Sequence, residues 1–133
     1  MFIFEFIVKE HHLDAYKHMN HAVYFQLFEE ARWETMAVQD CNIHKIEEMG
    51  QGPIVLGIQA KFKKEAKLRE KLTIISECIG VRSNLVTKIK QRMINAKEQT
   101  VCEAIVDIGI FDTKKRKLVR MSEFWLNAFK APV

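Results

Sequence analysis

The hydrophobic and polar positions of this chain change their period twice. Residues 2–9 have the composition of a short strand, and residues 10–20 are mostly polar. From His21 to Gln39 the apolar residues follow the i, i+3, i+4, i+7 spacing of an amphipathic helix, at Tyr24, Leu27, Phe28, Ala31, Thr35 and Val38. One long helix is therefore predicted, with Asn20 as its N-cap and a solvent side made of Glu29, Glu30, Arg32 and Glu34.

The rest of the chain has the pattern of a short helix followed by successive strands. The helix is predicted over residues 43–49, and Gly52-Pro53 is predicted to break the chain before extended structure starts. Alternation then predicts strands over residues 54–63, 72–81, 85–94, 100–111 and 117–121, with hairpin turns at 80–84 and after Asp112, and a last helix capped by Ser122. This order predicts an α+β domain in which one helix is buried against a curved antiparallel sheet.

Composition narrows the class of protein. The 133 residues are 48% hydrophobic with only five Gly and two Pro, which is typical of a single compact domain, expected over residues 1–133. Cys41, Cys78 and Cys102 are widely separated, so reduced core thiols are expected rather than disulfides. The apolar N-terminus contains Glu5 and lacks a basic start, and no segment approaches the roughly 18 apolar residues of a membrane span. A cytoplasmic protein is expected.

The charge pattern bears on partners. Net charge is a modest +4, with basic residues concentrated in 61–71 and 114–117. These runs can attract phosphate groups, or they can be a solvated sheet edge and a hairpin turn. Nucleic-acid binding requires a larger basic excess with exposed aromatic residues among the cations, whereas the Phe residues here fall at core-type positions. No nucleic-acid partner is expected.

Residues 14–24 carry most of the candidate chemistry, because a carboxylate, two histidines and an asparagine run directly into the predicted helix. The first N–H groups of a helix lack intrahelical partners and form a partly positive end that can hold a developing oxyanion. With an acyl carbonyl on those N–H groups, Asp14 or a water that it activates can attack the carbonyl carbon. The segment therefore predicts acyl hydrolysis, although an isolated Asp in a loop more often only forms a turn.

A zinc site is the competing interpretation of the same segment. Imidazole and carboxylate ligands suit zinc, and five candidates lie close together, namely His11, His12, Asp14, His18 and His21. No His-Glu-x-x-His pattern is present, and the direction of the rings across the predicted loop and helix junction is unconstrained. Neither a metal nor another cofactor is expected.

Residues 14–32 resemble the hotdog-fold acyl-CoA thioesterases of the 4-hydroxybenzoyl-CoA thioesterase type, including their Tol-Pal-associated bacterial relatives. The family segment reads Asp, two residues, Gly-His-Val-Asn, three residues, Tyr, then an aromatic-rich helix. The matching residues here are Asp14, His18, Asn20, Tyr24, Phe28, Glu29, Ala31 and Arg32. The chain departs from the family at Lys17, which replaces a Gly and removes easy access to positive φ, and at Glu65 and Arg69, which replace Pro and Gly.

The resemblance implies a role for individual residues. Asp14 is expected to be the nucleophile or the general base, and the backbone N–H of His21 to polarise the thioester carbonyl. His18 and Asn20 are expected to shape the substrate loop and Tyr24 to line the acyl pocket. Ser83 corresponds to a small hydroxyl residue near the family site, or is an ordinary turn residue. The phosphates of CoA are expected to meet Lys61, Lys63, Lys64 or Arg82.

The resemblance also implies the partners. It implies an acyl-CoA substrate, with acyl carrier protein as an open alternative, and a homodimer or homotetramer whose active site lies between subunits. A long apolar row in residues 101–110 agrees with an oligomer, because one helix cannot cover both faces of a five-stranded sheet. The alternative function is a non-catalytic hotdog module that binds acyl-CoA or a protein, with Lys17 marking a site that has lost its geometry.

Overall fold

The computed structural model describes residues 1–129, apart from the side chains of Val81 and Arg82. Its elements in chain order are β1 (Phe2–Ile7), a 3-10 turn η1 (Glu10–His12), α1 (His21–Ala37), α2 (Ile43–Met49), β2 (Gln51–Phe62), β3 (Lys71–Ser83), β4 (Val86–Ile94), β5 (Thr100–Asp112), β6 (Lys117–Val119) and α3 (Glu123–Phe129). All strand pairs are antiparallel, in the order β1-β3-β4-β5-β2, with β6 also paired to β5. The predicted α+β class is confirmed.

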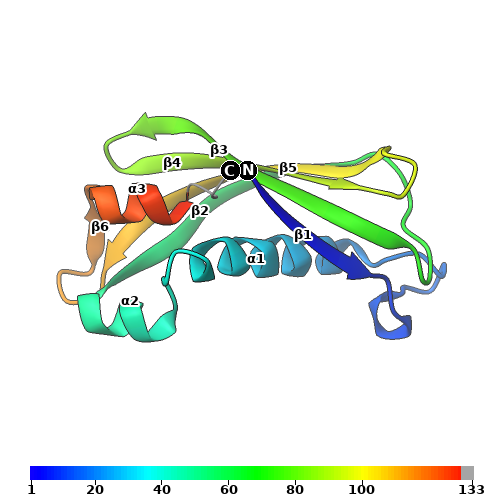
Figure 1. The fold of residues 1–133 in the computed structure, drawn as a ribbon, viewed down its shortest axis with the longest axis horizontal. Helices are drawn as coiled ribbons and strands as arrows, with labels where there is room; N and C mark the ends of the chain where they lie inside the picture. The colour runs from blue at the N-terminus through cyan, green and yellow to red at the C-terminus, as the bar shows by residue number, and fades with distance from the viewer. Residues whose placement is uncertain (130–133) are drawn as a thin grey trace.

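The helix α1 lies along one face of the twisted sheet (Figure 1). It buries the predicted apolar stripe except at Val38, which is the C-cap residue and is 52% exposed. Two apolar clusters fill the space between α1 and the sheet. One surrounds Tyr24 and Phe28 at the start of the helix, and the other surrounds Met36 and Trp125 at its end, where α3 packs. The ends of α1 are therefore held by different parts of the chain.

The prediction that Arg32 faces solvent is wrong, because its side chain is only 8% exposed. Its Nη1 donates to Oε1 of Gln91 on β4 at 2.8 Å. The Nε2 of Gln91 donates to the carbonyl of Phe28 at 2.9 Å and to Oγ of Ser76 on β3 at 3.0 Å. Gln91 is itself fully buried. This polar network bonds the middle of α1 to β3 and β4 across the core.

Two predicted chain breaks are also wrong. Gly52 and Pro53 lie inside β2, where Pro53 is paired with Ile110 of β5. Because β2 is an edge strand, it needs hydrogen bonds on one side only and tolerates a residue without an N–H group. The turn predicted at 80–84 starts too early, because β3 continues to Ser83 and the turn between β3 and β4 lies at residues 84–85. Gly80, with φ of +144°, lies at a register shift within the β3–β4 pair rather than in the turn.

The outer edge of the sheet at β2 is apolar. β2 is paired with β5 alone among the described strands, and its large apolar side chains are 38–51% exposed at Ile54, Val55, Leu56, Ile58 and Phe62. A strand edge of this kind offers both unpaired backbone groups and hydrophobic surface to another strand. Within residues 1–129, no helix combines the length and apolarity needed to cross a lipid bilayer.

Candidate active site

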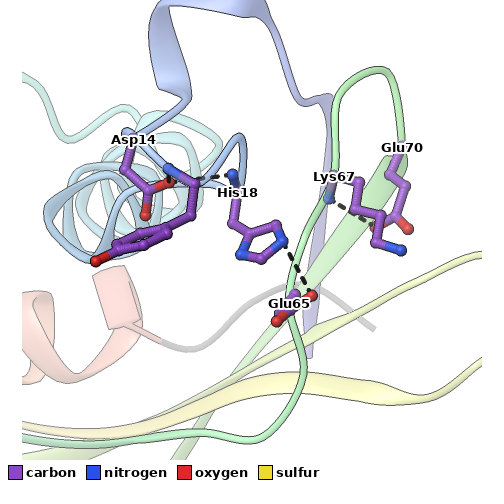
Figure 2. Close-up of polar contacts among 6 residues, drawn as sticks. Asp14, His18, Glu65, Lys67 and Glu70 are labelled. Atoms are coloured by element: carbon purple, nitrogen blue, oxygen red, sulfur yellow. Dashed lines mark hydrogen bonds and ion pairs between the residues drawn. The ribbon is translucent and has the colours of Figure 1, made fainter.

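Asp14 closes the loop between η1 and α1 with its own groups. Its N–H donates to the carbonyl of His18 at 2.8 Å, and its carbonyl accepts from the N–H of Lys17 at 3.1 Å. Its Oδ1 accepts from the N–H groups of Tyr16 at 2.8 Å and His18 at 3.1 Å (Figure 2). No hydrogen bond from residues 1–129 reaches Oδ2. One carboxylate oxygen therefore holds the loop, and the other is available for chemistry.

Lys17 occupies the one left-handed position of this loop, with φ of +64°. A side chain in this region costs roughly 1–2 kcal/mol relative to ordinary backbone. The loop nevertheless keeps the bonds that Asp14 makes to its neighbours. Lys17 thus adopts the left-handed conformation that glycine reaches most easily, at the position where the thioesterases that this segment resembles have glycine. The loop is closed although a lysine stands there.

The helix α1 starts at His21, as predicted. Asn20 is its N-cap and accepts from the N–H of Ala22 at 2.9 Å, which confirms the predicted cap. The N–H of Val23 donates to the carbonyl of Asn20 at 3.0 Å. The N–H of His21 has no acceptor among the described residues. The first turn therefore has one uncapped donor, beside the positive end of a helix of 17 residues.

Four of the predicted site residues meet in one cavity of about 340 Å³. Asp14, His18, His21 and Tyr24 line it together with Met19, Phe62, Lys63, Lys64 and Glu65. The ring of Tyr24 packs edge-on against Phe62, with centroids 5.1 Å apart. Burial raises the pKa of Tyr24 to about 12, so its phenol is neutral at physiological pH. The cavity combines an aromatic wall with polar groups at the helix start.

Glu65 belongs to this site although the sequence pattern gave it no role. Its carboxylate lies 3.1 Å from Nε2 of His18 (Figure 2). The neighbouring backbone is also bonded to the loop, since the N–H of Met19 donates to the carbonyl of Ala66 at 2.8 Å and His18 forms an isolated antiparallel bridge with Lys67. The segment after β2 therefore forms one wall of the cavity.

The remaining predicted site residues lie elsewhere. Asn20 does not line the cavity and acts on the loop as a cap. Lys61 is exposed on β2 opposite Glu103, also outside the cavity. Ser83 ends β3, a strand of 13 residues whose other end, Lys71, is near the site. At about 3.3 Å per residue these ends are roughly 40 Å apart. Its Oγ accepts from the N–H of Leu85 at 3.2 Å, as a turn residue does.

Two further expectations concern phosphates and metals. Lys63 and Lys64 line the cavity, whereas the side chain of Arg82 is outside the described part of the structure. In residues 1–129, no group of three or more His, Cys, Asp or Glu side chains is placed to hold a metal ion. The rings of His11 and His12 contact each other at a tilt of 52°, with centroids 4.1 Å apart. The cavity therefore combines a carboxylate, that of Asp14, with a helix N–H, that of His21, which can stabilise an oxyanion.

The sequence and the fold of this chain are similar to those of known proteins. The long-chain acyl-CoA thioesterase FadM of Escherichia coli (strain K12) is 27% identical over 124 residues, which are 86% of each chain. Among solved structures, a hypothetical protein from Aquifex aeolicus superposes with a TM-score of 0.88 at 21% identity, covering 98% of this chain and 100% of its own. The probable thioesterase YbaW from Escherichia coli gives 0.85 at 22% identity, covering 97% and 98%.

The family is shown by a broader match. Residues 8–129 match the sequence model of the thioesterase-like superfamily. This match confirms the predicted class of enzyme, a thioester hydrolase, and the structural neighbours confirm the hotdog fold. The chain therefore belongs to the thioesterase-like superfamily.

Proposed function

We propose that this protein hydrolyses acyl-CoA to a free acid and CoA, with Asp14 as the reacting carboxylate. The observation that carries the proposal is that Asp14 and His21 line the same cavity, one with an unengaged carboxylate oxygen and the other with an uncapped helix N–H. The similarity to FadM, a long-chain acyl-CoA thioesterase, supports the choice of substrate class.

The chemistry follows two routes that share one oxyanion donor. In both, the thioester oxygen accepts from the N–H of His21, and the helix end stabilises the charge that develops on it. As a nucleophile, Asp14 bonds to the carbonyl carbon, the C–S bond breaks and CoA leaves as a thiolate that takes a proton; water then hydrolyses the anhydride. As a general base, Asp14 takes a proton from a water whose oxygen bonds to the carbonyl carbon; the C–S bond then breaks, and the CoA thiolate that leaves takes a proton.

The other cavity residues position the substrate in this proposal. Tyr24 and Phe62 supply apolar wall for the acyl chain near the carbonyl. His18 holds the loop through its backbone contacts with Asp14 and reaches Glu65 with its ring. The narrower family assignment, to the 4-hydroxybenzoyl-CoA or Tol-Pal type, stays a prediction, as do an acyl carrier protein substrate, a role for Lys61 and a cytoplasmic location.

We also propose that the active unit is an oligomer built on a pair of chains joined along β2. The exposed apolar row and unpaired edge of that strand support it. Antiparallel pairing of β2 with its copy turns the partner around, so that the end of the partner's sheet at which β3 terminates lies on the same side of the pair as Asp14. This arrangement gives Ser83 a route to the site that one chain does not offer. A sedimentation mass of a single chain contradicts the pair.

The test compares thiol release from short, long and aromatic acyl-CoAs by the wild type and Asp14→Asn. The asparagine keeps an oxygen for the Tyr16 and His18 N–H groups, so the loop stays closed while the reacting carboxylate is lost. We expect kcat/KM to fall by about a hundredfold or more. Asp40→Asn, at an exposed position after α1, is the matched control and should retain activity. Wild-type binding of acyl-CoA without turnover refutes the enzyme and favours the non-catalytic module.

A further inference from the structure

A second cavity, of about 530 Å³, adjoins the active-site cavity and shares Lys64 and Glu65 with it. It lies between the segment that follows β2 and the turn that joins β4 to β5. Its charged lining consists of four lysines and two glutamates, which are Lys64, Lys67, Lys71, Lys97, Glu65 and Glu70. We refer to this cavity as the lysine basin. Its size is in the range of small-molecule sites.

Three of the four ammonium groups in the lysine basin are available to a ligand. Nζ of Lys71 lies 3.2 Å from a carboxylate oxygen of Glu5. By contrast, no ion pair within residues 1–129 engages Nζ of Lys64, Lys67 or Lys97. The basin therefore presents an unbalanced positive charge.

Its two glutamates are already engaged by other groups. The carboxylate of Glu65 contacts Nε2 of His18 at 3.1 Å, and that of Glu70 accepts from the backbone N–H of Lys67 at 3.3 Å. Figure 2 shows these two contacts side by side along one segment of the chain. Both carboxylates thus have partners of their own, and the three free lysines remain to meet an anion.

The backbone fixes the lysine basin relative to Asp14. The bridge between His18 and Lys67 joins the basin wall directly to the active-site loop. On the opposite wall, Oδ1 of Asn95 accepts from the N–H groups of Lys97 and Gln99, both at 3.0 Å, and closes the turn that carries Lys97. The backbone of both walls is therefore fixed before binding, and the cost of ordering falls on the exposed lysine side chains.

We infer that the lysine basin binds the phosphate groups at the nucleotide end of CoA while the thioester occupies the active-site cavity. The inference rests on the proposed function and specifies its substrate. The CoA arm of a thioester seated at Asp14 has to extend out of the active-site cavity, and the lysine basin adjoins that cavity through the shared residues Lys64 and Glu65. Phosphate dianions are attracted to clustered ammonium groups in a concave site. Of the lysines expected to meet these phosphates, Lys64 lines the basin and Lys61 does not, and the proposal adds Lys67 and Lys97.

The test uses one acyl group on three thiols: CoA, dephospho-CoA, which lacks the 3′-phosphate, and pantetheine, which lacks the nucleotide. The variant is Lys67→Glu/Lys97→Glu. The control, Lys114→Glu/Lys115→Glu, makes the same charge change in the exposed turn after β5. We expect the variant to raise KM for acyl-CoA by about tenfold or more with kcat little changed, to raise it less for acyl-dephospho-CoA, and to leave acyl-pantetheine unaffected. Added salt should raise the wild-type KM most for acyl-CoA, less for acyl-dephospho-CoA and not at all for acyl-pantetheine.

The outcomes separate this inference from the proposed function. An unchanged KM for acyl-CoA, or an equal rise for acyl-pantetheine, overturns the lysine basin while leaving the hydrolase intact. Turnover of acyl carrier protein thioesters alone overturns it as well. If the wild type hydrolyses no thioester, calorimetric titration with 3′,5′-ADP still decides: saturable binding by the wild type that is lost in the variant but kept in the control supports the basin. Absence of such binding refutes it.

Discussion

The buried pair of Arg32 and Gln91 yields a sharp prediction about stability. Gln91→Leu removes three hydrogen bonds at once and takes this partner from the Arg32 guanidinium, the Ser76 hydroxyl and the Phe28 carbonyl, of which only the carbonyl keeps a second bond within the helix. Each unsatisfied buried polar group costs about 1–3 kcal/mol, and a lost hydrogen bond to a charged group costs about 1.5–3 kcal/mol. We therefore expect Gln91→Leu to lower the free energy of unfolding by about 3–5 kcal/mol, a large share of the stability of a domain this size.

The cost depends on the arginine, so removing it should return part of the loss. In Arg32→Met/Gln91→Leu the guanidinium is gone and an apolar pair fills the space, as when a buried ionic group is replaced by hydrophobic residues. We expect the double variant to be more stable than the sum of the two single effects by about 2 kcal/mol. The measurement is urea unfolding of all four proteins at one chain concentration, because subunit association adds to apparent stability.

A control pair tests whether this coupling is specific. Thr87 is fully buried on the same strand and donates to the carbonyl of Gly80 at 3.0 Å. It lies four residues from Gln91, about 13 Å along β4, and has no contact with the guanidinium. Thr87→Val and Arg32→Met should therefore add within about 0.5 kcal/mol. If the changes in unfolding free energy of Gln91→Leu and Arg32→Met are also additive, the two residues are not coupled and the reasoning about this polar network is wrong.

Two further predictions concern Lys17 and Tyr24. Lys17→Gly relieves about 1–2 kcal/mol of strain from the left-handed backbone conformation and costs about 0.5–1 kcal/mol because the unfolded chain gains conformational entropy. The melting temperature should therefore rise slightly, and a fall would show that Lys17 is not strained. Because burial raises the pKa of Tyr24 from 10.0 to about 12, the unfolded chain loses this proton first. The contribution of Tyr24 to stability is complete below pH 10 and is lost as pH rises toward 12. Urea unfolding at pH 9 and 11 should show a larger loss for the wild type than for Tyr24→Phe, and equal losses refute the assignment.

The features that sequence predicted best depend on neighbours along the chain. Asn20 caps the helix two residues ahead of it, and Gly50 ends α2 in the left-handed conformation that glycine favours. Their partners are local, so composition and spacing were sufficient. The same holds for the position of Asp14 and His21, which adjoin one helix start and line one cavity, whereas their catalytic roles stay a prediction.

The features that sequence missed depend on distant partners. Arg32 has the spacing of a solvent residue, yet its acceptor comes from a strand 59 positions later. Glu65 and Lys97 enter the two cavities from separate connections, and no periodicity links either to residue 14. Pro53 was read as a break because its tolerance depends on β2 being an edge, which only the order of the strands decides.

The position of β2 has a consequence for synthesis on the ribosome. Its described pairing partner, β5, ends about 50 residues later in the chain. At roughly 5–20 residues per second, translation takes about 3–10 s to complete that partner. Throughout this interval the apolar strand Gln51–Phe62 has no sheet to join, which makes it a natural binding segment for chaperones acting on the nascent chain. The order of translation thus makes β5 the strand whose arrival ends this vulnerable period.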